Sequence, residues 1–278
     1  MRPSPLIPLL LPCGGAAALR LPSATLSRRR SFTTTKAAAI VPGQDPGELF
    51  DLYEAPHPSP RLFSGEPTAT GFSKARQLVH RDGDWHRAIN VWMYTSRGEL
   101  LLQRRAEGKD TFPGHWDVSV AGHITSGDSV LETALKEVEE ELGISISSST
   151  NTTTTTTTHS NNSNALLEKI GVVATMARGS SPLGGAFECN EYKDLYLYKL
   201  NFADGGGDVD IKTALDFQPN EEVSDVKLVP WLEVKQDMLA QLNDKDGELD
   251  GPMVPRPRHY IDLLFDALAG RVGSGDVY

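Results

Sequence analysis

The sequence predicts an α/β protein in which a mixed β-sheet lies between helices on both of its faces. Two observations support this prediction. Short apolar stretches of strand length recur along the chain, and three segments show helical periodicity, one among the strands and two after them. A sheet covered on both faces is the natural packing for this order of elements. The 278 residues, 39% of them hydrophobic, are enough for one substantial core or two small ones.

The first 44 residues are predicted to be a targeting signal rather than a folded segment. They contain six basic side chains and no acidic one, and they are rich in Arg, Ser, Thr, Ala and Leu. This composition predicts an organellar transit peptide, with the mitochondrion favoured over the plastid. A secretory signal at residues 6–11 is the competing interpretation, although prolines interrupt that apolar run. Without a transit peptide, the protein would be cytoplasmic.

The remainder of the chain is acidic. The whole chain has a net charge of −10, but the 21 basic and 37 acidic side chains beyond residue 44 give −16. An acidic body argues against a nucleic-acid partner, and no apolar run approaches the length that a membrane span needs. The two cysteines, Cys13 and Cys189, lie far apart in the sequence, which argues against a disulfide and against a cysteine-based zinc site.

The folded domain is predicted to cover residues 70–270, after a proline-rich linker at 45–69. Residues 88–95 and 99–105 have strand-like composition and are separated by a Ser-Arg-Gly turn, which predicts a β-hairpin. Residues 116–121 are predicted to form a third short strand.

The next predicted element is a helix that starts at Asp128 or Ser129 and stops at Gly143. Its apolar residues recur at helical spacing and form a stripe that can pack on a core. They are Val130, Ala134, Leu135, Val138 and Leu142.

A low-complexity insertion at residues 145–164 follows this helix. Its run of Ser, Thr and Asn has nothing to bury, so we expect a disordered surface segment. The fold then resumes with strands predicted at 166–177, 191–200 and 223–230, and with helices predicted at 231–242 and 258–269.

The predicted helix carries a group of carboxylates with an unusual arrangement. Glu137, Glu140 and Glu141 are three and four residues apart, so their side chains emerge from one face of the helix. Like charges at this spacing repel each other unless a cation lies between them. Converging carboxylate oxygens suit Mg²⁺ or Mn²⁺, whereas the simpler interpretation is a solvated acidic face.

The 23 residues from Gly122 to Ile144 resemble the Nudix box, Gly-x5-Glu-x7-Arg-Glu-U-x-Glu-Glu-x-Gly-U, in which U is aliphatic. Two positions differ, because Asp128 stands where the family has Glu and Lys136 where it has Arg. The residues that match are Gly122, Glu137, Val138, Glu140, Glu141, Gly143 and Ile144.

The resemblance implies a Nudix α/β/α sandwich and the hydrolysis of a diphosphate linkage by water attack on phosphorus. It implies that Glu137, Glu140 and Glu141 bind Mg²⁺ or Mn²⁺ with help from the Gly122 main chain, and that Glu140 and Glu141 take part in catalysis. Glu191, at the start of a predicted strand, is a candidate for a further metal-binding or base carboxylate.

The two departures from the box are expected to act around the metal site rather than in it. The family residues at positions 128 and 136 help to order the metal-binding loop. Asp128 and Lys136 keep the signs of these charges, but the acid is shorter and the planar guanidinium is lost. We therefore expect the metal-binding loop to be held less tightly, while the metal ligands themselves are unchanged.

Residues outside the box resemble the isopentenyl-diphosphate isomerase-like branch of the Nudix family. The resemblance covers Leu78–Trp92, Leu101–Arg105 and Phe112–His123. In true isomerases three histidines and two glutamates hold a metal, and a cysteine and a glutamate move the protons. His80, His86, His123 and Glu191 match that set, but Ala121 replaces the catalytic cysteine and Cys189 replaces the second metal glutamate.

These departures favour hydrolysis, because alanine has no proton to donate. Isomerisation of a prenyl diphosphate is the first alternative, and a non-catalytic Nudix-like binding module is the second. The three histidines are interpreted as hydrogen-bonded side chains of a substrate-binding loop. A second metal site for Mn²⁺ or Zn²⁺ is the alternative for them. Cys189 is interpreted as a small apolar residue at a strand edge.

Basic side chains are needed to meet a small-molecule diphosphate substrate in so acidic a chain. The candidates are Arg87, Arg104, Arg105 and Lys109. Strand alternation sends Arg104 and Arg105 to opposite faces, so only one of them can point inward. Arg256 and Arg258 are interpreted as surface charges. The leaving group of the substrate and the oligomeric state stay open.

Overall fold

The computed structural model describes residues 47–109, 111–146, 167–181, 185–201, 210–243 and 252–272. The predicted transit peptide at 1–44 lies outside the described residues, as does all of the predicted insertion except residues 145 and 146. Within the described residues, no helix is both long enough and apolar enough to cross a lipid bilayer.

In the part of the chain that the structure describes, a nine-stranded mixed sheet forms the centre of the fold, and β3 (Trp85–Thr95) pairs with four of the other strands. Along its whole length β3 pairs in parallel with β8 (Gly185–Leu200). Its other edge pairs antiparallel with β6 (Val120–His123) in the middle and with β4 (Glu99–Arg105) at the end, where the predicted hairpin turns. The sheet is therefore mixed, as predicted.

The remaining strands extend the sheet on both sides of β3. β7 (Glu168–Ser181) pairs with β8, and β9 (Val223–Pro230) pairs with β4. The strand predicted at 116–121 is instead divided into β5 (Trp116–Asp117), which pairs with β4, and β6. Ser119 lies at the break, where its hydroxyl donates to the Leu101 carbonyl and accepts from the Met93 N–H.

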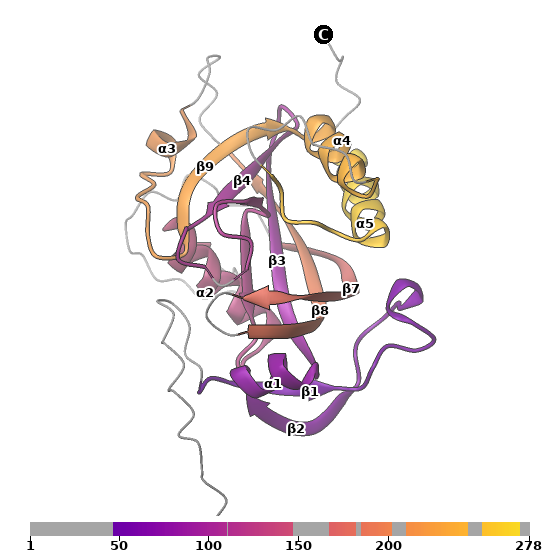
Figure 1. The fold of residues 1–278 in the computed structure, drawn as a ribbon. Helices are drawn as coiled ribbons and strands as arrows, with labels where there is room; N and C mark the ends of the chain where they lie inside the picture. Colours follow the sequence, from indigo (N-terminus) through magenta and orange to yellow (C-terminus); the bar gives the residue numbers. More distant parts are fainter. Residues whose placement is uncertain are drawn as a thin grey trace, which may run out of the picture. The chain divides into compact units, whose positions relative to one another are not determined.

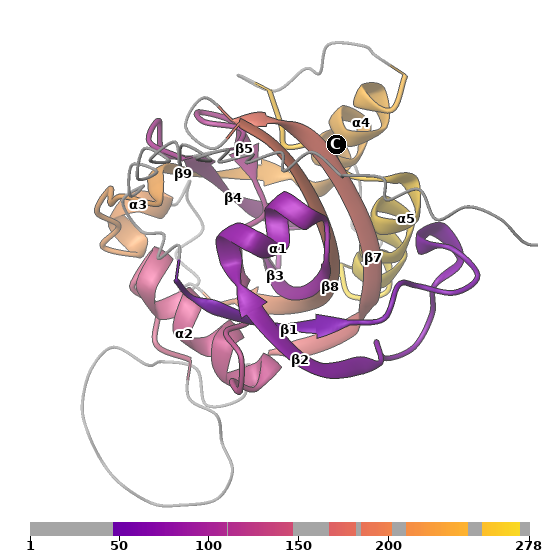
Figure 2. The same cartoon turned by 60° about the horizontal axis from the view of Figure 1, so that its bottom comes forward.

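Helices cover both faces of the sheet, as Figures 1 and 2 show. On one face α2 (Val130–Leu142) packs its apolar stripe against Ile89, Val91 and Met93 of β3. The opposite face is covered by α4 (Trp231–Gln241) and α5 (Arg258–Ala269). The α/β/α sandwich predicted from the sequence is confirmed. A short helix, α3 (Ile211–Ala214), precedes β9.

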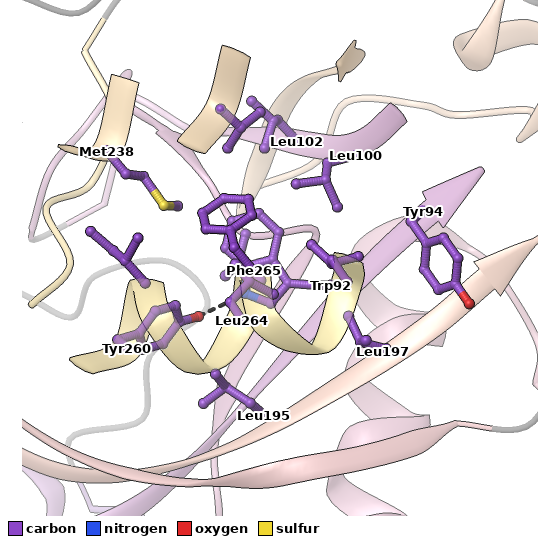
Figure 3. Close-up of a cluster of buried hydrophobic side chains, with 14 of the residues drawn as sticks. Trp92, Tyr94, Leu100, Leu102, Leu195, Leu197, Met238, Tyr260, Leu264 and Phe265 are labelled. Carbon is purple, nitrogen blue, oxygen red and sulfur yellow. Dashed lines mark hydrogen bonds between the residues drawn. The ribbon is translucent and has the colours of Figure 1, made fainter. Parts of the chain in front are cut away.

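The core under α5 is built around Trp92, which alternation directs away from α2. Trp92 and Tyr260 are both fully buried, and the Trp92 indole N–H donates to the Tyr260 hydroxyl at 2.8 Å (Figure 3). Tyr260 in turn donates to Asn90 Oδ1 at 3.0 Å. This chain of hydrogen bonds satisfies the polar atoms of two large aromatic side chains inside the core.

The prediction of a linker at residues 45–69 is wrong. This range contains β1 (Leu49–Tyr53) and the short 3₁₀ helix η1 (Pro60–Leu62), and β2 (Ala69–Ala75) begins at its end. β1 pairs with β2 and touches β3, and Phe50 of β1 is fully buried. The prolines at 56, 58 and 60 follow the strand instead of preventing it, so composition alone was misleading. Next comes α1 (Arg76–Asp82).

Candidate functional site

The carboxylate helix α2 begins and ends where the sequence predicted. Ser129 is the N-cap: its hydroxyl accepts from the Glu132 N–H at 3.2 Å and donates to the Glu132 carboxylate at 2.7 Å. Gly143 ends the helix in the left-handed conformation, with φ of 70°. These two local signals set the ends of α2, and its apolar stripe sets the face that it turns to the sheet.

Two carboxylates of α2, those of Glu137 and Glu141, lie against β6. Glu141 is only 4% exposed, and it accepts a hydrogen bond from the Ala121 N–H at 3.3 Å. The Glu137 carboxylate lies against Gly122, so closely that a β-carbon at Gly122 would collide with it. Glu140 is on the outer side of the pair, with 59% of its side chain exposed. The predicted cluster of Glu137, Glu140, Glu141 and the Gly122 main chain is thus assembled by α2 and β6.

The two inner carboxylates are crowded by negative charge. Burial, and then the charge of Glu140, raises the pKa of Glu137 to about 7. Burial also raises the pKa of Glu141 well above its usual range, with further contributions from the charges of Glu137 and Glu222. A divalent cation among these oxygens would favour the charged forms of both groups. The donor set, carboxylates and main chain, fits Mg²⁺ or Mn²⁺.

The loop that leads into α2 is held by Asp51 of β1 and by Glu48, the residue just before β1. The Ser126 hydroxyl donates to Asp51 at 2.6 Å, and the Gly127 N–H donates to the same carboxylate at 3.4 Å. The Thr125 hydroxyl donates to Glu48 at 2.6 Å. Sequence reasoning missed both acidic residues because it assigned their segment to a linker.

We expect Asp51→Ala to loosen the loop and to lower both stability and activity. The substitution removes the acceptor of two hydrogen bonds in a partly exposed loop, and a hydrogen bond of this kind contributes about 0.5–1.5 kcal/mol. The melting temperature and the kcat/KM for a diphosphate substrate measure these effects. Asp51→Asn, which keeps one acceptor oxygen, should fall between the wild type and Asp51→Ala. Equal activity in all three proteins would show that β1 does not order this loop.

Asp128 and Lys136, which were expected to order the loop together, are not paired with each other in the described structure. The Lys136 ammonium lies 3.8 Å from Glu140 on the next turn of α2, and both side chains are about 60% exposed. The Asp128 N–H donates to the Thr125 carbonyl within the loop. The ordering role expected for this pair is instead carried by Asp51 and Glu48.

Arg87, one of the candidates for binding the substrate, is engaged in a buried ion pair. Its guanidinium donates twice to Asp194, at 2.6 and 2.9 Å, and once to Glu66 at 2.6 Å. Lys169 joins the same two carboxylates. The Asp194 side chain is fully buried, so Arg87 and Lys169 neutralise a charge inside the protein. This arrangement gives Arg87 a structural role.

The two arginines at the end of β4 donate hydrogen bonds to the loop that follows. Arg104 donates to the Gly114 carbonyl at 3.0 Å and lies over the Trp116 ring. Arg105 donates to the Thr111 carbonyl at 2.9 Å. Lys109 is paired with Glu222.

Asp117 links Arg105 to an arginine that the sequence had assigned to the surface. Arg105 donates to Asp117 at 3.3 Å, and Arg256 donates to the other oxygen of the same carboxylate. Only 8% of the Arg256 side chain is exposed, so the surface assignment was wrong for Arg256, whereas Arg258 is 61% exposed, as expected. The position of Arg256 before α5 gave no sign of its burial.

The three matched histidines and Cys189 come together on the face of the sheet opposite α2. His80 is in α1, His86 in β3, His123 in β6 and Cys189 in β8. One ligand atom from each of these four residues lies within 4.8 Å of all the others. Pairing of His86 with Glu191, and of Ala88 with His123, explains how strands distant in sequence create this cluster.

Glu191 lies beside this cluster. Its Oε1 is 3.0 Å from His123 Nε2 and 3.7 Å from His86 Nε2, and its other oxygen accepts from Lys193. Burial alone would raise the pKa of Glu191, but Lys193 and His123 hold it well below its usual range. The carboxylate is therefore a buried negative charge next to three imidazoles. Its contacts are with the histidines, the group that it joins in the resemblance to the isomerase-like branch.

Burial disfavours the charged form of all three histidines. Burial lowers the pKa of His80 to about 4, and it lowers the pKa of His86 and His123 as well. Phe50 stacks on His86 and His123, with ring centroids 5.3 and 4.9 Å away, and meets His80 edge-on. Neutral imidazoles that are held in place by packing have the form that metal ions bind.

The sandwich fold, the glycine-led loop and the glutamate helix together have the arrangement that the resemblance to the Nudix box implied. A family model described as NUDIX domain matches residues 84–250, more than half of the chain. The chain belongs to the Nudix family.

Several curated proteins are similar to parts of this chain. Nudix hydrolase 3 of Arabidopsis thaliana is 38% identical over 173 residues, which are 62% of this chain and 19% of that protein. An isopentenyl-diphosphate Delta-isomerase of Serratia proteamaculans is 38% identical over 84 residues, 30% of this chain and 46% of that protein. The chain thus spans less than half the length of these relatives.

Solved structures with a similar arrangement have low sequence identity. A Deinococcus radiodurans crystal structure matches 72% of this chain and 91% of its own, with 19% identity and a TM-score of 0.43. A C. elegans Ap4A hydrolase matches 66% of this chain and 98% of its own, with 18% identity and a TM-score of 0.38.

Proposed function

We propose that this chain is a Mg²⁺- or Mn²⁺-dependent pyrophosphohydrolase that cleaves a small-molecule diphosphate by water attack on phosphorus. The observation that carries the proposal is the packing of Glu137 and Glu141 against the main chain of β6, with Glu140 beside them. Membership in the Nudix family and the names of the hydrolase relatives support it.

Each residue of this site has a distinct task in the proposed reaction. Glu137, Glu140 and Glu141 would hold the cation, and the absent side chain of Gly122 leaves room for Glu137. The Ala121 N–H orients the carboxylate of Glu141. When bound, the cation would neutralise the phosphoryl oxygens and lower the pKa of a bound water.

The test is a panel of diphosphate compounds: nucleoside diphosphate sugars, dinucleotides, oxidised nucleotides and prenyl diphosphates, each with Mg²⁺ and with Mn²⁺. We expect phosphate or pyrophosphate release from at least one class, and a loss of about 100-fold or more in Glu140→Gln. Glu139→Gln is the matched control, because Glu139 is exposed on the same helix. Equal rates in the two variants would contradict the proposal. No release by the wild type would favour a non-catalytic binding module.

Isomerase activity is the second candidate, because the histidine cluster and Glu191 are retained. Against it, Ala121 stands at the position of the acid–base cysteine, and its side chain packs on the core under α5. We expect no conversion of isopentenyl diphosphate to its dimethylallyl isomer in a coupled or NMR assay. Turnover at a rate that the Glu140→Gln variant retains would replace the hydrolase proposal.

An organellar location is also proposed, with the mitochondrion first. It rests on the basic composition of residues 1–44. A fluorescent protein fused behind these residues should enter mitochondria or plastids. Diffuse cytoplasmic fluorescence would contradict the proposal.

A further inference from the structure

Arg256 is a buried arginine whose positive charge is only partly balanced by the described residues. Among those residues, Arg256 and Arg105 both form their ion pairs with Asp117 alone, so two guanidinium groups share one carboxylate. Only 8% of the Arg256 side chain and 4% of the Asp117 side chain are exposed. Glu191, which also acts electrostatically on Arg256, is already paired with Lys193. The group of three therefore carries a net positive charge where little water can reach it, and such a charge is costly.

Arg87 shows how a buried arginine is balanced elsewhere in this protein. Arg87 and Lys169 are joined to two carboxylates, those of Asp194 and Glu66, so that network contains two positive and two negative charges. The described part of the chain supplies no second carboxylate of this kind to the ion pairs of Arg256. An anion from outside the chain would supply it.

One hydrogen-bond donor of Arg256 is also unused. Its Nε is buried and has no hydrogen-bond partner in the described structure, which is costly for a donor of a charged group. The same guanidinium donates to Asp117 through Nη2 and lies over the Tyr260 ring, 5.4 Å from its centroid. These two contacts hold the planar group in one orientation. An anion at Arg256 would therefore meet a donor that is already oriented.

Attachment of the C-terminal segment to the sheet does not depend on Arg256. The Trp116 N–H donates to the Pro252 carbonyl and the Val254 N–H donates to the Trp116 carbonyl, both at 2.9 Å. Met253 and Val254 are only 2% and 5% exposed. Main-chain hydrogen bonds and apolar burial thus fasten this segment to β5 ahead of Arg256, and a purely structural role does not account for a buried arginine.

Arg256 lies close enough to the glutamate site to meet one end of a substrate. Its partner Asp117 precedes Ala121 by four residues, so the Cα atoms of Asp117 and Ala121 are at most about 15 Å apart. The Ala121 N–H donates to the Glu141 carboxylate. A substrate whose diphosphate is held at α2 can extend over this distance with its leaving group.

We propose that Arg256 is a specificity-determining residue that binds an anionic oxygen, of a phosphate or a carboxylate, on the leaving group of the substrate. This inference rests on the proposed hydrolase function and narrows its substrate class to diphosphates with an anionic leaving group. A guanidinium group binds phosphate and carboxylate oxygens through paired N–H donors. An apolar prenyl chain in the same place would leave the charge without a partner, which disfavours prenyl diphosphates.

The first experiment tests the anion site without metal and without turnover. The full chain, stripped of divalent ions, is titrated with inorganic phosphate at constant ionic strength while its melting temperature is measured. We expect phosphate to raise the melting temperature of the wild type but not of Arg256→Met. Arg258→Gln is the matched control and should respond like the wild type, because Arg258 carries the same charge two residues away and is 61% exposed. Arg256→Lys keeps the charge and should retain part of the response even where Arg256→Met folds poorly.

The second experiment places the anion on the substrate. Binding is measured in the Glu140→Gln background with Mg²⁺, for NADPH against NADH, which differ by one phosphate, and for UDP-glucuronate against UDP-glucose, which differ by one carboxylate. We expect Arg256→Met to weaken binding of the anionic member of at least one pair by about 10- to 100-fold and to leave the neutral member nearly unchanged. The pair that responds identifies the anion as phosphate or carboxylate.

The outcomes of the two experiments separate this inference from the hydrolase proposal. Glu140→Gln should lose hydrolysis but keep the wild-type response to inorganic phosphate, so the two proposals can fail independently. Equal responses of the wild type and Arg256→Met to phosphate, or no response in either, would overturn the anion site. Equal binding of both members of each pair by the protein that retains Arg256 would overturn its role in specificity.

Discussion

Glu141→Gln is expected to slow hydrolysis strongly without destabilising the metal-free protein. Glu141 is buried beneath the loop, and its carboxylate is the group that the Ala121 N–H orients. Glutamine keeps an acceptor for that N–H but cannot supply a negative oxygen to a divalent cation. Since the cation contributes several kcal/mol to the stabilisation of the transition state, we expect kcat/KM to fall by about 100- to 1,000-fold.

The stability of the same variant, measured without metal, is not expected to fall. In the metal-free protein, burial and the neighbouring charges of Glu137 and Glu222 oppose ionisation of Glu141. A neutral amide of the same size removes that penalty, so the melting temperature without metal should be unchanged or higher. With saturating Mg²⁺ or Mn²⁺, the wild type should gain more in melting temperature than the variant, because only its site binds the cation tightly. A variant that is less stable without metal would indicate a structural role for Glu141 instead.

The parts of the site that could be predicted from the sequence are those with local signals. The glutamates, the N-cap Ser129 and the stop Gly143 all lie within one helix, where spacing determines which side chains share a face. Their arrangement needs no information about distant segments. The structure accordingly places Glu137 and Glu141 where the helical spacing predicted.

The parts that could not be predicted depend on pairing between distant segments. Asp51 meets Ser126 across 75 residues, and Arg87 meets Asp194 across 107. A five-residue strand followed by prolines has too weak a pattern to predict such a contact, so β1 was assigned to a linker. Long-range ion pairs likewise leave no mark on composition.

The histidine cluster likewise depends on pairing between distant segments and could not be predicted in full from the sequence. Its members are at positions 80, 86, 123 and 189, a spacing that matches no local zinc motif. The resemblance to isomerases grouped the histidines, but the parallel alignment of β3 with β8 is what brings Cys189 to them. Counting cysteines therefore could not indicate that Cys189 lies beside the three histidines.

Gly122→Ala is expected to be the most disruptive single change in the glutamate site. A β-carbon at this position would overlap the Glu137 carboxylate, and β6 cannot retreat because it is paired with β3. The protein must move either the Glu137 side chain or the end of α2. Overpacking of this kind costs about 1–3 kcal/mol, and displacement of Glu137 should remove most of the hydrolytic activity. Chemical denaturation and kcat/KM measure the two effects.

A double-mutant cycle separates the collision from other effects of the alanine. Glu137→Ala shortens the side chain that collides, so adding Gly122→Ala to it should cost much less stability than in the wild type, with a coupling energy of about 1 kcal/mol or more. Activity should not return in the double variant, because the metal-binding carboxylate is gone. If the two substitutions were additive in stability, the absence of a side chain at Gly122 would have another reason, and the tight packing of Glu137 against β6 could not be the feature that positions the cation.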